Sequence, residues 1–171
     1  MTVSFTIASI VAVLSALLAL TRRNAMHALL YLIVSLLSIA LVFLLMGAFL
    51  AAALEVIIYA GAIMVFFIFV IMMLNIAEAP LPKGEDWLSP RSWAGPAFLA
   101  AVLVCELAYV LVQVKGVQGH AAASPKQVGI ALYGPYMLGV ELASLLLLAG
   151  LVGAFHLGRR DDFPPQEGEG G

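Results

Sequence analysis

Three residues in one long apolar segment could do chemistry inside a membrane. The segment Ala53–Asn75 is long enough to cross a bilayer, and its first third contains Glu55, Tyr59 and Gly61. A carboxylic side chain in the hydrocarbon costs about 2.5–3.5 kcal/mol on insertion scales, so an acid within a membrane helix indicates a functional site. This segment is therefore the first place to look for function.

Glu55 and Tyr59 are suited by type and spacing to pass protons. They are four residues apart, so on an α-helix they lie about 40° apart on one face and can share a hydrogen bond or a water molecule. A carboxyl and a phenol in this arrangement predict a proton-relay element. The alternative is that Glu55 reaches the membrane surface or pairs with a neighbouring helix, because it lies about 10 Å from the centre of its segment.

Two further apolar segments each contain one acid. Glu106 lies near the middle of the fourth segment, and Glu141 lies one to two turns inside the fifth. With Glu55 and Tyr59 they could line one hydrated cavity, and we predict these four residues as a proton path. The sequence leaves open the alternative that Glu106 and Glu141 bind basic groups of partner subunits.

Gly61 interrupts a run of bulky side chains. A glycine at such a position lets a helix kink, form a π-type bulge or approach another backbone closely. Plain close packing is the simpler interpretation, because glycine is common in membrane helices. The residues that follow Gly61, IMVFFIFVIMML, form a wholly apolar half-helix.

The composition is that of an integral membrane protein. Of 171 residues, 64% are hydrophobic and 11% are charged, and the mean hydropathy is +1.10, whereas soluble domains average about 45–50% apolar and 25% charged. Five apolar segments have spanning length. The predicted fold is an all-α bundle of five transmembrane helices forming a single domain, residues 1–158, with spans at approximately 3–20, 27–46, 49–75, 93–114 and 136–157.

The positively charged residues predict the orientation of the chain. With alternating spans, six of the eight lie on one side of the membrane, and only Lys115 and Lys126 lie on the other. By the positive-inside rule the N-terminus is outside (periplasmic) and the C-terminus is cytoplasmic. Residues 159–171 combine charge, proline and glycine without an apolar repeat, which predicts a flexible cytoplasmic tail. The six residues are Arg22, Arg23, Lys83, Arg91, Arg159 and Arg160.

The connections between segments differ in length. Gly47 and Ala48 form almost no loop, so the second and third helices are expected to be antiparallel neighbours. The long connection 115–134 contains an apolar patch at Val128–Leu132. This patch is expected either to lie along the membrane surface or to lie under a neighbouring subunit, and the sequence favours neither.

Several classes of function are excluded or disfavoured. The single cysteine, Cys105, cannot form a metal or iron–sulfur site alone, and no two histidines have ligand spacing. Nucleotide-binding motifs and nucleophile elbows are absent, and no basic surface for nucleic acid exists. The sequence contains no internal repeat of the kind found in stand-alone carriers. We therefore expect no bond chemistry, cofactor or metal in this chain.

One part of the chain resembles a known family. The run LEVIIYAGAIMVFFIFVIMMLN, preceded by MGAFLAAA and by TRRNAMHALLYLIVSL, is similar to subunit J of bacterial respiratory complex I, the counterpart of mitochondrial NADH dehydrogenase chain 6. The resemblance is strong over residues 47–75, with the YAGAIMV core as its specific part.

The resemblance implies a cofactor-free membrane subunit of a proton-translocating NADH-quinone oxidoreductase. NADH, FMN, the iron–sulfur clusters and quinone are then expected on other subunits, so this chain would touch quinone only indirectly. Its partners would be the other membrane-arm subunits and the lipid bilayer, and its location the inner (cytoplasmic) membrane of the cell, as a multi-pass protein. Homologous subunits also occur in hydrogenases and cation antiporter complexes, and a purely structural scaffold role is a further alternative.

The resemblance also implies a mechanism for the third helix. Carried over, a π-bulge that forms and relaxes during turnover would fall around Tyr59–Phe67, with Gly61 as its pliable point. One extra residue in a turn rotates everything beyond it by about 100°. In one form Met64 or Val65 could make a dry plug, and in the other water could connect the acids.

Overall fold

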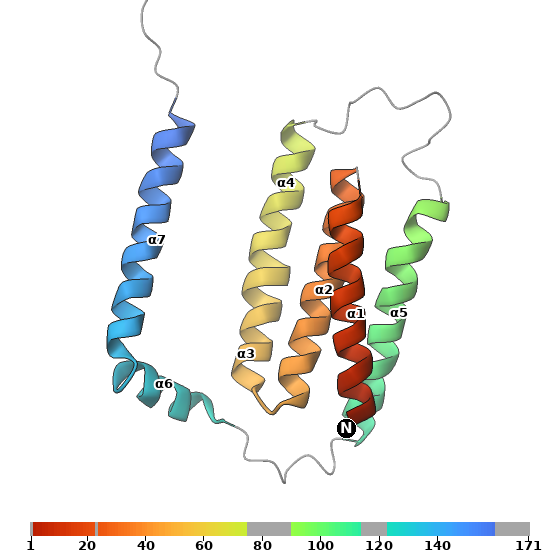
Figure 1. Ribbon diagram of the computed structural model, residues 1–171, viewed down its shortest axis with the longest axis horizontal. Coiled ribbons are helices and arrows are strands. Elements are labelled where there is room, and N and C mark those ends of the chain that lie inside the picture. The colour runs from red at the N-terminus through yellow and green to blue at the C-terminus, as the bar shows by residue number, and fades with distance from the viewer. Residues whose placement is uncertain (1, 23, 75–89, 114–122, 160–171) are drawn as a thin grey trace, which may run out of the picture. The chain divides into compact units, whose positions relative to one another are not determined.

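The computed structural model describes residues 2–22, 24–74, 90–113 and 123–159. The chain divides into two compact units, Met1–Ser124 and Pro125–Gly171, and each is described by itself. Every element in the described residues is helical (Figure 1).

The predicted all-helical fold is confirmed for the described residues, and it is consistent with five membrane spans. Five helices are long and apolar enough to cross a bilayer. The orientation of the chain and the single-domain boundary stay predictions, and the predicted tail lies outside the described residues except for Arg159. The first unit contains α1 (Thr2–Thr21), α2 (Ala25–Leu45), a third span built from α3 (Phe49–Leu54), η1 (Glu55–Ile63) and α4 (Met64–Leu74), and α5 (Pro90–Gln113); the second contains α6 (Pro125–Tyr133) and α7 (Met137–Gly158).

Small side chains hold α1 against α2. Ser35 Oγ donates to the Ala12 carbonyl at 2.9 Å, and Ser38 Oγ donates to the Ala8 carbonyl at 2.6 Å. Because lipid tails are as apolar as leucine, membrane helices associate through close packing and hydrogen bonds between helices. The two serines therefore fix the register of the first two spans.

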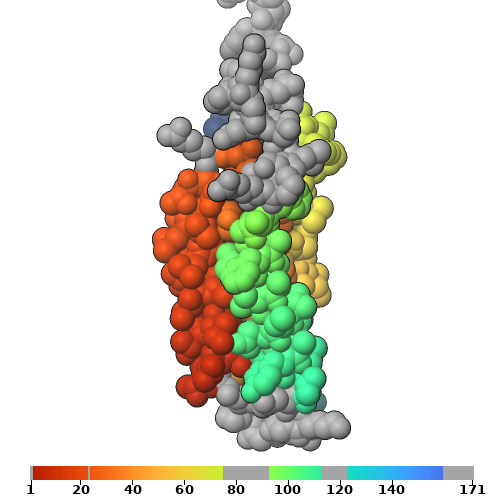
Figure 2. Space-filling view, turned by 90° about the vertical axis from the view of Figure 1, so that its right-hand side faces the viewer, coloured from red at the N-terminus to blue at the C-terminus, as the bar shows by residue number. Residues whose placement is uncertain are grey.

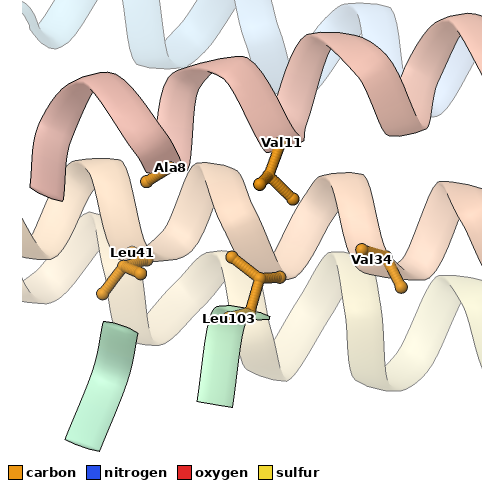
Figure 3. Close-up of a cluster of buried hydrophobic side chains, with 5 residues drawn as sticks. All are labelled: Ala8, Val11, Val34, Leu41 and Leu103. Atoms are coloured by element: carbon orange, nitrogen blue, oxygen red, sulfur yellow. The ribbon is translucent and has the colours of Figure 1, made fainter. Parts of the chain in front are cut away.

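A small apolar core joins α1, α2 and α5. Figure 3 shows Leu103 of α5 reaching into the seam between α1 and α2, and Figure 2 shows α5 running beside α1. The fourth span is thereby held on the first two, although it follows them by a long connection. The buried members of this core are Ala8, Val11, Val34, Leu41 and Leu103.

Gly47 makes the tight turn between the second and third spans. Its φ of 80° lies in the left-handed region, which a residue with a Cβ rarely adopts. The Gly47 N–H donates to the Leu44 carbonyl at 3.1 Å, and the Ala48 N–H donates to the Phe43 carbonyl at 2.9 Å. This Schellman pattern satisfies the last carbonyls of α2 and turns the chain back at once, as the near-absent loop in the sequence predicts.

Candidate functional site

The third span contains a π-helix. At its start the Glu55 N–H donates to the Ala51 and Ala52 carbonyls, and after its end the Met64 N–H donates to the Tyr59 carbonyl, five residues back, and to the Gly61 carbonyl. The π-helical residues are Glu55–Ile63. Such helices occur mostly as short bulges inside α-helices and often at functional sites.

The expected position of the bulge, Tyr59–Phe67, was wrong by one turn. Met64 to Phe67 are α-helical, and the π-helix begins at Glu55 instead. Gly61 belongs to the last part of the π-helix. Most of the wide turn therefore precedes Gly61 in the chain.

Gly61 fits the wide turn because it has no side chain. A Cβ built on it would lie 3.0 Å from the Val56 carbonyl oxygen, which is closer than ordinary contacts allow. That oxygen belongs to the backbone of the same π-helix, so it cannot move aside independently. A larger residue at position 61 would strain this segment.

Glu55 and Tyr59 are both part of the π-helix. A turn of i to i+5 hydrogen bonds has between four and five residues, so the two side chains still lie on one face of the segment. Glu55 is half-buried, whereas 51% of the Tyr59 surface is exposed. The acid and the phenol therefore share a face, with the acid nearer the interior of the first unit.

The two predicted gate residues differ in burial. Met64 is 6% exposed and lies in the interior of the first unit, whereas Val65 is 61% exposed. They are neighbours at the point where the π-helix gives way to α4. A rotation of the helix at this junction would exchange what these two side chains face.

Glu106 lies on the face of α5 that is turned toward α1 and α2. It lies at helical spacing from Leu99 and Val102, which pack against the core of α1 and α2. The residue is half-buried, and its Oε2 atom is buried without a hydrogen-bond partner among the described residues. Glu106 is therefore a carboxyl that faces the packed interior of the first unit, and a path shared with Glu55 stays a prediction.

The cavity beside the π-helix is apolar. It has a volume of about 400 Å³ and lies between α2, the third span and α5. Ala52, Ala53 and Val56 contribute to it from the third span, and no charged side chain lines it. The structure thus places a dry space, and not the acids, between η1 and α5.

Glu141 lies in the second unit. It is exposed on α7, and its backbone carbonyl accepts a hydrogen bond of 2.7 Å from Ser144 Oγ. Its membership of one path with Glu55 and Glu106 stays a prediction. No group of three or more His, Cys, Asp or Glu side chains that could hold a metal ion occurs within residues 2–22, 24–74, 90–113 and 123–159.

One cluster was not identified from the sequence. At the far end of α2 from Gly47, the Arg22 guanidinium lies 5.1 Å from the centre of the Tyr31 ring and donates to its hydroxyl at 3.4 Å. Tyr31 is buried, and its hydroxyl occupies the space where Gly95 of α5 has no side chain. Gly95 was the only sign of this contact in the sequence. Its partner, Tyr31, is too distant in the chain to be recognised from a local pattern.

A π-helical segment in the third of five candidate spans was what the resemblance to complex I led us to expect, although the expected segment lay one turn later. The model of the family described as NADH-ubiquinone/plastoquinone oxidoreductase chain 6 matches residues 15–157. The chain belongs to this family.

Curated relatives in the family are close in sequence and in length. NADH-quinone oxidoreductase subunit J of Pseudomonas aeruginosa is 54% identical over 92% of this chain and 96% of its own. Subunit J of Escherichia coli K12 is 51% identical over 92% of this chain and 86% of its own, and that of Buchnera aphidicola from Schizaphis graminum is 50% identical over 88% and 93%. The likeness therefore extends well beyond residues 47–75.

Membership of the chain 6 family makes this chain a membrane subunit of an NADH-quinone oxidoreductase complex. It is a multi-pass protein of a bacterial membrane, with five candidate spans. Its partners include other subunits of that complex.

Proposed function

We propose that this subunit couples electron transfer from NADH to quinone, which occurs elsewhere in the complex, to proton translocation by changing the form of its third span. The observation that carries the proposal is the π-helix Glu55–Ile63, which contains both members of the predicted relay. In the π form the wide turn is present, and in the α form it is relaxed. The two forms turn the residues beyond the segment to different faces.

The gate lies where the π-helix meets α4. Met64 is packed inside the first unit and Val65 points outward, so relaxation of the wide turn rotates both. In one form these apolar side chains block the water path from Glu55 and Tyr59. In the other form they move out of that path, and water fills it. The apolar cavity beside Val56 supports the proposal, because it gives the segment space in which to repack.

The protons are carried by the acids, with Glu55 and Tyr59 as the element attached to the switch. Glu106 supports a longer path, since a buried carboxylate oxygen without a protein partner is costly unless water or a proton satisfies it. Glu141 completes the proposed path from the second unit. Cofactors and quinone bind to other subunits, and this chain supplies conformational coupling without bond chemistry of its own.

A scaffold role is the second candidate, and the exposed surface of the third span favours it. None of the residues of η1 is buried, and Phe66 and Phe69 of α4 are 63% and 52% exposed. Such side chains could serve only to bind neighbouring subunits. The relatives named above are all NADH-quinone oxidoreductase subunits, which disfavours the assignment to hydrogenases or antiporter complexes.

The experiment compares Gly61→Val with Ala62→Val in the assembled complex. The first adds bulk against the Val56 carbonyl, and the second places the same valine side chain one residue later, at an exposed position. A bias of about 1 kcal/mol between two forms changes their ratio roughly fivefold. We expect Gly61→Val to lower the number of protons pumped per NADH, while electron transfer to an artificial acceptor persists and Ala62→Val pumps normally.

Glu55→Gln in the same assay tests the acid, with Glu55→Asp as the variant that keeps a carboxyl. The gating role is wrong if Gly61→Val and Glu55→Gln both pump fully. A loss of assembled complex on native gels before any loss of coupling would favour the scaffold role instead.

A further inference from the structure

We propose that α6 is an anchor that lies flat in the membrane interface and binds phospholipid. The sequence left residues 128–132 with two alternatives, the membrane surface or a neighbouring subunit. The geometry of the second unit favours the membrane surface. The inference does not depend on the proposed function.

The orientation of α6 follows from α7. With 22 residues, α7 has a length of about 33 Å at 1.5 Å per residue, which matches the roughly 30 Å of hydrocarbon in a bilayer. Its first residue, Met137, must therefore lie at a membrane surface. Only three residues separate the end of α6 from Met137, so α6 cannot be far from that surface.

The corner between the two helices turns the chain sharply. Figure 1 shows α6 running across the end of α7 and not in line with it. The Tyr136 N–H donates to the Ala131 carbonyl at 3.1 Å, and the Met137 N–H donates to the Gly134 carbonyl at 3.2 Å. A helix that crosses the end of a spanning helix at the surface lies along the plane of the membrane.

Gly134 is required at this corner. A Cβ on it would lie 2.9 Å from the Ile130 carbonyl oxygen, so a residue with a side chain would push the last turn of α6 away. Pro135 follows and cannot continue the hydrogen bonds of a helix. The bend is therefore encoded by the local sequence and does not need a partner to form.

The faces of α6 differ in the way that an interface requires. Val128, Ala131 and Leu132 are three or four residues apart and form one apolar face. Val128 and Ala131 are half-buried in the chain, whereas Lys126 is exposed and lies about 200° around the helix from Val128. Ile130 lies on the same side of the helix as Lys126, so the apolar and polar faces are not fully separated. We therefore expect α6 to lie at the depth of the lipid headgroups and not deeper in the hydrocarbon.

Aromatic residues mark the same level. Tyr133 ends α6 and is 82% exposed, and Tyr136 precedes α7 and is 66% exposed. Tyrosine is enriched at the boundary between hydrocarbon and headgroups, because its ring is apolar and its hydroxyl is polar. The corner thus has an apolar face toward the hydrocarbon, two phenols at the boundary and a lysine on the opposite face, at the aqueous side of the headgroups.

Photo-crosslinking in the assembled complex tests the inference. The photoreactive residue p-benzoylphenylalanine replaces Leu132, Val128 or Lys126 in cells whose phospholipid carries radioactive phosphate, and the membranes are irradiated. We expect Leu132 and Val128 to give this chain labelled with phospholipid at several times the yield from Lys126, without larger protein adducts.

Two outcomes overturn the inference. Adducts of Leu132 and Val128 with another subunit would show that α6 lies under a protein, and equal lipid labelling from Lys126 would show that the helix has no preferred face. Tyr136 is a further position, since p-benzoylphenylalanine differs from tyrosine only at the end of the ring and leaves the corner intact. It is expected to label phospholipid, and protein adducts alone would contradict the proposal.

Discussion

Individual glycines decide the closest approaches in this chain, each for a different physical reason. Gly47 is needed for its backbone conformation, with φ at 80°. Gly61 is needed because a Val56 carbonyl of its own helix lies where a Cβ would be. Gly95 is needed because another helix places the Tyr31 hydroxyl there. In the proposed switch, Glu55 depends on the wide turn that Gly61 permits.

The contact between Gly95 and Tyr31 predicts the effect of a single methyl group. Gly95→Ala would overlap the Tyr31 hydroxyl, which also accepts a hydrogen bond from Arg22. Forcing such a group into a packed site costs about 1–3 kcal/mol. We expect this loss in the free energy of unfolding of the full chain, measured in mixed detergent micelles.

Tyr31→Phe provides the control for this prediction. It removes the overlapping oxygen and leaves the ring carbon Cζ at 3.2 Å from the added methyl. Gly95→Ala should therefore cost less in the Tyr31→Phe background than in the wild type, which a double-mutant cycle measures. Equal costs in both backgrounds would mean that the hydroxyl does not limit the approach of α5.

At the scale of elements, the third span is one membrane crossing with two kinds of helix. Its α-helical ends, α3 and α4, enclose a π-helix of nine residues. The serines between α1 and α2 hold the first two spans in one register, whereas none of the residues of η1 is buried. A hydrogen-bonded pair of helices beside a less buried π-helix is the arrangement that the proposed switch requires.

Thiol accessibility at the junction of η1 and α4 tests that change. Cys105 is the single cysteine, so Cys105→Ala combined with Met64→Cys or Val65→Cys gives this subunit one thiol. A maleimide reacts with thiols that meet water, so at rest we expect slow modification of both, because Met64 is buried and the apolar surface that contains Val65 is covered by lipid or a neighbouring helix. During turnover with NADH and quinone, modification of Met64→Cys should rise as water enters the path, measured in this chain by mass spectrometry. Unchanged rates during turnover would argue that the junction does not rotate.

At the scale of the whole molecule, this is a set of membrane spans that is completed by other subunits. Large apolar side chains are exposed on all five candidate spans, as suits a surface covered by lipid or by neighbouring helices. Five spans put the two ends of the chain on opposite sides of the membrane. The basic residues then predict which side each end occupies.

Reporter fusions test the predicted orientation. Green fluorescent protein fused after the last residue should fluoresce, because the C-terminus is expected in the cytoplasm. Alkaline phosphatase inserted in the connection before α6 should be active, because that connection is expected in the periplasm. The reverse pattern would show that the six basic residues on one side do not determine the orientation.

The sequence by itself determined the class of the protein, the number of its spans and its family. These follow from local properties of the sequence. The number of consecutive apolar residues determines whether a helix can span the membrane, and one glycine, at position 47, determines a tight turn. The family was visible in the run around Gly61. The acids could be found in the same way, since a charge in an apolar segment needs no partner to be noticed.

Only the tertiary structure decided what surrounds those residues. The sequence left Glu106 either in a shared hydrated cavity or against a partner subunit, and the structure adds that it lies on the face of α5 toward the core of α1 and α2, with an apolar cavity beside η1. The start of the π-helix at Glu55 and the contact of Tyr31 with Gly95 were likewise unforeseen. The physical reason is that a helix face acquires its neighbours from packing between distant segments, and that packing depends on small volumes and single hydrogen bonds that no local pattern records.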